Sequence, residues 1–195
     1  MAKRKPVKLP GSITPPVKAV MVEPRPAARF EGADEEDYYR WEAQLTTIAM
    51  PNKNGLPEDW ILSPISALLG LPLQVTNWPS DGLPQKNETL TGLFVVVDPE
   101  DESFGKVKIR RVTGIAMLAR VDGEDLCDKH VEALLTYVNT CGSEIVAFAS
   151  EWHDDRVADA KQLVQRLLTP RAFGRFFAQH RAAKKWSDVR CPVSY

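Results

Sequence analysis

The sequence predicts an α+β fold, in which a small antiparallel sheet of three or four strands packs with four or five helices. Of the 195 residues, 44% are hydrophobic, an ordinary proportion for a globular chain. β-Branched residues concentrate between residues 91 and 121, and apolar residues recur at helical spacing over most of the last 70 residues. The expected elements from residue 91 onward read strand, strand, helix, strand, helix, helix, with shorter helices ahead of them.

Residues 1–29 are predicted to be a disordered basic arm. They contain six prolines and few large apolar side chains, so they lack the amide donors and the core residues that a sheet or helix requires. Seven Lys or Arg face a single acid, Glu23. Residues 30–195 are expected to form one domain.

The first half of that domain is predicted to be mostly helix and loop. Spacing of apolar and aromatic residues over 38–45 favours a short helix behind an acidic first turn. Ser63 and Pro64 can begin a helix over 64–69, and Gly70 can end it. Prolines at 72, 79 and 84 favour a loop-rich connection over 71–85, across which Trp60 and Trp78 are expected to reach the core.

Strands and long helices are expected after residue 90. Residues 90–98 and 106–112 form a predicted hairpin, with Lys106, Lys108 and Arg110 on one strand face, and 114–121 continues the sheet. A helix over 124–140 is expected to end before Gly142, and residues 143–150 are a strand candidate. Residues 154–168 form a further predicted helix, which stops at Thr169-Pro170.

The last predicted helix, FGRFFAQHRAAKKW over 173–186, separates aromatic from basic side chains. Helical spacing places Phe173, Phe176 and Phe177 on one apolar stripe, whereas most of the cations lie on other faces. The rings are then packing groups for the fold or for an interface. Contact of the cations with phosphate is favoured over stacking of the rings on bases.

Charge is segregated along the chain, although the net charge is only −1. Residues 1–29 carry a balance of +6, residues 156–190 a balance of +7, and residues 30–155 a balance of −14. Basic elements at both ends favour sequence-independent contact with nucleic acid, RNA rather than DNA. The candidate nucleic-acid-binding residues are Lys3, Arg4, Lys5, Lys8, Lys106, Lys108, Arg110, Arg171, Arg175, Arg181, Lys184 and Lys185, and the candidate interface residues are Phe173, Phe176 and Phe177.

Catalytic, metal and cofactor signals are weak. Cys127, His130, Cys141 and His153 are a conceivable zinc set, but they lack a paired C-x2-C motif and are better explained as structural residues. His153 followed by two aspartates is a conceivable catalytic base, and the alternative is that an aspartate caps the next helix. No phosphate-binding glycine motif occurs. No catalytic, metal-binding or cofactor-binding residue is therefore assigned.

Location and function follow as expectations. Three cysteines favour a reducing compartment, the basic first residues lack the apolar run of a secretory signal, and the longest apolar run, LFVVV, is too short to span a membrane. We expect an intracellular or virion protein that is not an enzyme, associates with itself and binds nucleic acid. In overall organisation it resembles viral coat, nucleocapsid and matrix proteins. The alternative is an adaptor or regulator whose last helix docks on a protein or on an anionic membrane surface.

Overall fold

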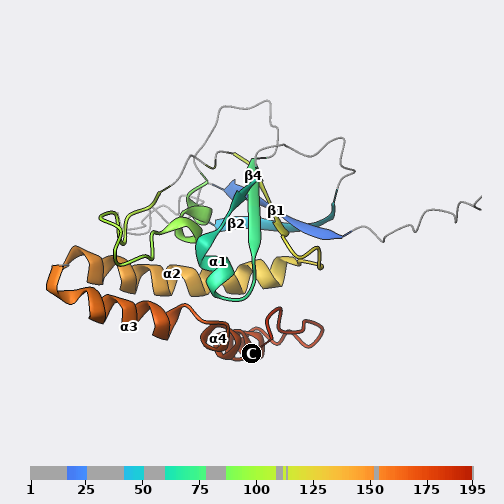
Figure 1. The fold of residues 1–195 in the computed structure, drawn as a ribbon. Helices are drawn as coiled ribbons and strands as arrows, with labels where there is room; N and C mark the ends of the chain where they lie inside the picture. The colour runs from blue at the N-terminus through green and yellow to red at the C-terminus, as the bar shows by residue number, and fades with distance from the viewer. Residues whose placement is uncertain are drawn as a thin grey trace, which may run out of the picture.

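The computed structural model describes residues 17–25, 42–50, 60–77, 87–108, 112, 114–151 and 154–194. Within them, one five-stranded antiparallel sheet has helices stacked on one side, which confirms the α+β class with more strands than expected (Figure 1). In chain order the elements are β1 (Lys18–Arg25), β2 (Glu42–Ala49), β3 (Ile61–Leu62), α1 (Pro64–Leu68), β4 (Leu73–Asn77), η3 (Glu88–Phe94), β5 (Ala116–Arg120), α2 (Asp128–Ser150), η4 (Asp154–Arg156), α3 (Val157–Leu167) and α4 (Pro170–Ala183), where η marks a 3₁₀-helix.

The strand order is β2-β1-β5-β4-β3, and every pairing is antiparallel. Val20 lies opposite Leu118, which lies opposite Val75, so three apolar side chains form one row across the centre of the sheet. All three are fully buried in the main core. A smaller cluster centred on Met117 occupies the other face of the sheet, and the half-buried Trp60 packs against it as expected.

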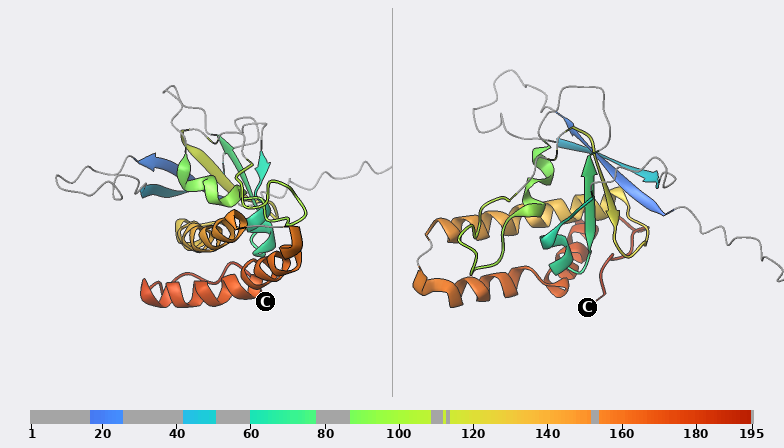
Figure 2. Two further views of the ribbon diagram at one scale, coloured as in Figure 1. Left: turned by 90° about the vertical axis from the view of Figure 1, so that its left-hand side faces the viewer. Right: turned by 45° about the horizontal axis from the view of Figure 1, so that its top comes forward.

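Helix α2 is the central helix of the molecule. Its buried residues extend from Val131 to Ile145, and side chains from several of its faces enter the core. The helix lies between the sheet and the two C-terminal helices (Figure 2). Helix α3 folds back antiparallel to α2, and the Tyr137 hydroxyl of α2 donates a hydrogen bond of 2.6 Å to the carbonyl of Leu167 at the end of α3. Helix α4 then crosses α2 on the side away from the sheet.

The predicted capping of α1 is confirmed. Ser63 Oγ accepts a hydrogen bond of 3.2 Å from Ser66 N, Pro64 occupies the first turn, and the helix ends before Gly70. Ser63 Oγ also donates to the carbonyl of Leu93, so the cap joins α1 to η3. Asn87 precedes η3 and is buried, with its side-chain amide donating to the carbonyls of Val22 and Gly114.

Three predictions in the first half of the chain were wrong. Part of the expected arm, Lys18–Arg25, is strand β1 in the interior of the sheet, because Val20 and Val22 alternate with side chains of the other face and enter the core. Residues 42–45, expected in a helix, belong to β2, and residues 73–77, expected in a loop, form β4. In each case pairing with a neighbouring strand outweighs the local preference. Residues 38–41 and Trp78 lie outside the described residues.

Two further strand predictions were wrong. Residues 88–94 form a 3₁₀-helix whose leucines face the core, and within the described part of the expected hairpin one isolated bridge pairs Val95 with Val107. Residues 143–150 continue α2 past Gly142, because Ile145 and Phe148 extend its apolar stripe. The strand at 114–121 and the helices at 154–168 and 173–186 are confirmed within a few residues as β5, α3 and α4.

Candidate functional site

Helix α4 carries the candidate basic surface. Thr169 caps it by accepting a hydrogen bond of 3.1 Å from Ala172 N, and Pro170 fits the first turn because that position needs no amide donor. Thr169 and Pro170, which the sequence predicted to end α3, therefore also begin α4. The helix has two faces of different chemistry.

The inward face is aromatic. Phe173 and Phe177 are 0% exposed, and their rings lie 6.2 Å apart in an edge-on arrangement. Phe176 is half-buried, with its ring 5.0 Å from that of Tyr137 and 5.3 Å from that of His180. The three phenylalanines thus fasten α4 to α2 within one chain, and Phe173 and Phe177 are not accessible on the surface.

The outward face carries basic side chains, and the other exposed side chains along it are small. Arg171 and Arg175 lie one helical turn apart and are exposed, as are Ala178 and Ala182 along the same face. Residues 160–187 contain seven Lys or Arg and no acid. Among the described residues, neither Arg171 nor Arg175 has an ion-pair partner. Both guanidinium groups are therefore available to an anionic ligand.

The other predicted cations of α4 are less available. Lys184 Nζ lies 2.8 Å from Glu132 Oε1 on α2, and Arg181 donates a hydrogen bond of 3.1 Å to the carbonyl of Val189. Lys185, just past the helix, is exposed and extends the basic surface. We name Arg171, Arg175 and Lys185 the α4 basic face.

The predicted basic strand does not join this face. Lys106 is exposed, and Lys108 forms an ion pair with Asp101, which holds the pKa of that carboxyl far below its ordinary value. Their turn packs against the last turns of α2, where Gly105 lies so close to Ala149 that a Cβ at Gly105 would collide with it. Helix α4, by contrast, packs on the first half of α2. Lys3, Arg4, Lys5, Lys8 and Arg110 lie outside the described residues.

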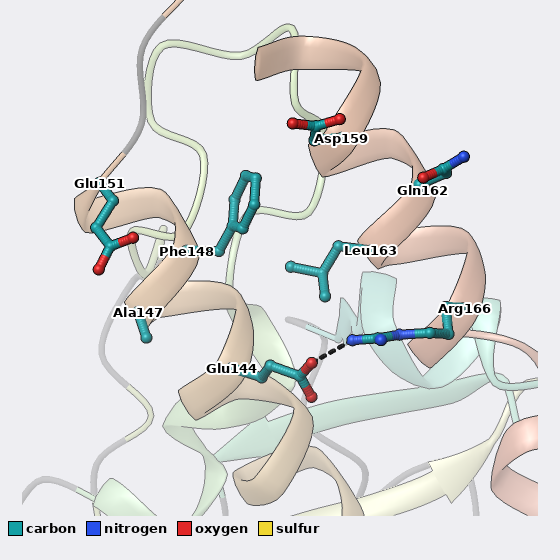
Figure 3. A pocket seen from close by; sticks show the side chains of 8 residues that line it. All are labelled: Glu144, Ala147, Phe148, Glu151, Asp159, Gln162, Leu163 and Arg166. Atoms are coloured by element: carbon teal, nitrogen blue, oxygen red, sulfur yellow. Dashed lines mark hydrogen bonds and ion pairs between the residues drawn. The ribbon is translucent and has the colours of Figure 1, made fainter.

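A second feature, absent from the sequence-based candidates, is a groove between the end of α2 and α3 (Figure 3). It encloses about 540 Å³, and side chains from both helices line it. The groove depends on the helical continuation of α2 through residues 143–150, which places Glu144 and Glu151 beside α3. A strand at 143–150, as the sequence predicted, would not form this groove. The lining residues are Glu144, Ala147, Phe148, Glu151, Asp159, Gln162, Leu163 and Arg166.

The conceivable zinc set is not assembled. Cys127 precedes α2 and Cys141 lies within it, so the two are about 21 Å apart along the helix. The His130 Nε2–H donates a hydrogen bond of 3.1 Å to the carbonyl of Arg190, and burial lowers the pKa of the imidazole. Burial also raises the pKa values of both thiols. No group of three metal-ligating side chains occurs among the described residues, and His153 lies outside them.

No protein-family model, curated protein or solved structure matches this chain. The helices that the structure describes include none with both the length and the apolar character needed to cross a membrane. The geometry of α4 and of the groove is therefore the basis for assigning a function.

Proposed function

We propose that this chain is a non-enzymatic assembly protein, which associates with copies of itself and binds nucleic acid through the phosphate backbone. Its role would be that of a coat, nucleocapsid or matrix protein, with RNA as the first polymer to test. One observation carries the proposal: α4 presents Arg171 and Arg175 outward on a face without acids, while its rings are used inside the fold.

Arginine suits this role because its planar guanidinium donates two parallel hydrogen bonds to one phosphate. The alanines that follow Arg175 along this face, Ala178 and Ala182, leave room for a backbone to approach the helix closely. Since the buried rings cannot stack on bases, binding should be largely independent of nucleotide sequence.

The adaptor alternative is less well supported. A helix that lies on a membrane needs an exposed apolar face opposite its cations, and here Phe173 and Phe177 have no exposed surface. Docking of the basic face on an acidic protein surface stays an outcome of the test.

The test is binding of a fluorescent oligouridine to the full chain, measured by anisotropy between about 50 and 200 mM salt. Replacing Arg171 and Arg175 by alanine should weaken binding and reduce the slope of log K against log salt by about 1.4, since each lost contact with a single strand removes about 0.7. The matched control replaces Lys161 and Arg166, which removes the same charge but from cations already paired with Glu100 and Glu144. Equal effects in both variants, or no binding by the wild type, would overturn the proposal.

A further inference from the structure

The groove between α2 and α3 has an apolar floor. Phe148 of α2 and Leu163 of α3 point toward one another, Ala147 also lines the groove, and the ion pair between Glu144 and Arg166 spans it at one end (Figure 3). Its volume, about 540 Å³, is in the range that holds a compact ligand or a few residues of a peptide. The groove can therefore make apolar contacts with a bound peptide as well as ionic ones.

The rim of the groove is acidic. Three carboxylates line it, from Glu144, Glu151 and Asp159, against one lining cation, Arg166. Beside the groove, the Arg156 guanidinium lies 4.4 Å above the Phe148 ring and 3.6 Å from Asp159, while Asp155 is exposed nearby. The surroundings stay negative after both arginines are counted. The contacts of Arg156 with the Phe148 ring and the Asp159 carboxylate show the type of side chain that binds here, a cation on an apolar stem.

The N-terminal part of the sequence contains a segment that fits such a groove. Residues 3–10, KRKPVKLP, carry four cations, and Val7 and Leu9 alternate with Lys8. No acid occurs before Glu23. Two prolines restrict the segment toward extended conformations, which lowers the entropy lost when a peptide binds. Its cations match the rim, and its apolar side chains match the floor.

The groove and the start of β1 lie at opposite ends of α2. The amide of Lys18 donates to Asp125, and its carbonyl accepts from Leu126, just ahead of α2, whereas the groove lies at the last turns of α2. Asp128 and Phe148 are about 30 Å apart along the helix, and Figure 1 shows the two ends on opposite sides of the molecule. An extended chain spans about 3.4 Å per residue, so Pro10 lies within about 24 Å of Val17. Residues 3–10 as a whole therefore cannot lie in the chain's own groove, whereas a groove in another copy is not limited by this tether. Head-to-tail contacts of this kind repeat from copy to copy.

We infer that the groove between α2 and α3 binds the basic N-terminal segment, residues 3–10, of a second copy of this chain. The inference rests on the proposed self-association and specifies the contact that produces it. It is independent of the α4 basic face, so the two can fail separately.

The first experiment measures self-association of nuclease-treated full chain by sedimentation at low salt. Replacing Glu151→Gln together with Asp159→Asn should raise the dissociation constant about tenfold, since two exposed ion pairs are lost. The matched control, Glu23→Gln with Glu102→Gln, removes the same charge from exposed acids outside the groove and should change the constant less than twofold. Equal unfolding temperatures for the two variants establish that both are folded.

The second experiment identifies the occupant. A photo-crosslinking phenylalanine analogue replaces the exposed Ala147, and copies labelled with heavy and light nitrogen are mixed before irradiation. Mixed-isotope crosslinks between position 147 and residues 3–10 are expected. Crosslinks within single copies only, crosslinks to other segments, or a wild-type chain that is monomeric at every accessible concentration would each overturn the inference. Oligouridine binding by the same samples tests the proposed function separately. A variant that loses self-association but still binds RNA would bear on the groove contact alone and not on RNA binding by α4.

Discussion

Individual side chains of α4 divide into those that hold the fold and those that face outward. Phe177 is fully buried against His130 and Phe173, whereas Arg175 is exposed one turn away from the next basic side chain. The same short stretch of sequence therefore stabilises the fold with one face and leaves cations exposed on the other.

Stability measurements should separate the two faces. Phe177→Ala is expected to lower the free energy of unfolding by about 3–5 kcal/mol, because it leaves a cavity in the core. Phe176→Ala should have a smaller effect, since that ring is half-buried, and Arg175→Ala should stay within about 0.5 kcal/mol. Urea denaturation of the three variants measures these differences. Equal stability of the Phe177 variant and the wild type would contradict the described packing.

His130 should make the stability pH-dependent. Burial lowers its pKa below the ordinary value of 6.5, and nearby Arg120 acts in the same direction, while the Arg190 carbonyl and Asp128 oppose it. The unfolded chain therefore binds a proton more readily than the folded chain once the pH falls below about 6.5. The stabilisation that the neutral imidazole contributes is present above that pH and is lost below it.

The measurement compares wild type with His130→Gln by urea denaturation at pH 7 and pH 5.5, since glutamine can still donate to the Arg190 carbonyl. The wild type should lose more stability on acidification than the variant. Carboxyls with lowered pKa values, including Asp122 and Asp188, titrate at lower pH and should contribute equally in both proteins. A parallel loss in the two proteins would show that His130 is not the group responsible.

At the level of elements, local sequence signals predicted the C-terminal helices, the α1 cap and strand β5, but not the other strands of the sheet. The phenylalanine stripe is a short-range signal that α4 uses as expected, whereas Thr169 and Pro170, predicted as the end of the preceding helix, also begin α4. Strand β1 has no comparable local signal, because it forms by pairing with β2 and with β5, and β5 lies nearly 100 residues further along the chain. The groove was likewise unpredictable, since it forms between α3 and a part of α2 that reads locally as a strand.

Truncation tests the reassignment of β1. A chain lacking residues 2–16 should keep a cooperative thermal transition, because the described pairings of the sheet begin after residue 16. A chain lacking residues 2–25 should lose it, since this removes the strand that pairs with both β2 and β5 along with the buried Val20 and Val22. Circular dichroism on heating measures both. A cooperative transition in the shorter chain would mean that β1 is dispensable.

Two glycines test the path of α2 and of the turn beside it. A Cβ at Gly142 would meet no atom within 4 Å, so Gly142→Ala should stabilise the chain by about 0.5–1 kcal/mol through helix propensity. Gly105 has a φ of +75°, and a Cβ there would lie 2.3 Å from Ala149 Cβ, so Gly105→Ala should destabilise by at least about 1 kcal/mol. Thermal denaturation distinguishes the two signs. Destabilisation by Gly142→Ala would contradict a continuous α2.

At the scale of the whole molecule, a net charge of −1 conceals two surfaces of opposite sign. The α4 basic face and the acidic groove lie on different parts of the helical layer. The groove lies at the last turns of α2, whereas α4 crosses α2 near its first half. Two separate surfaces allow one copy to hold a polymer and a neighbouring copy at the same time. Binding to a long polymer should then be cooperative, since each bound copy provides a groove or a basic segment for the next.

Cooperativity on long RNA tests this combination. Wild-type chain should bind a long polyuridine more cooperatively than a short oligouridine, and its binding isotherm should be steeper. The Glu151→Gln/Asp159→Asn variant should retain its affinity for the short oligouridine but bind the long polymer with a shallow isotherm, because neighbours no longer contact one another. The Arg171→Ala/Arg175→Ala variant should self-associate normally and bind both polymers weakly. Fluorescence anisotropy on short and long polymers gives all three isotherms. Undiminished cooperativity in the groove variant would place the contact between neighbours on another surface, even if the α4 basic face holds the RNA.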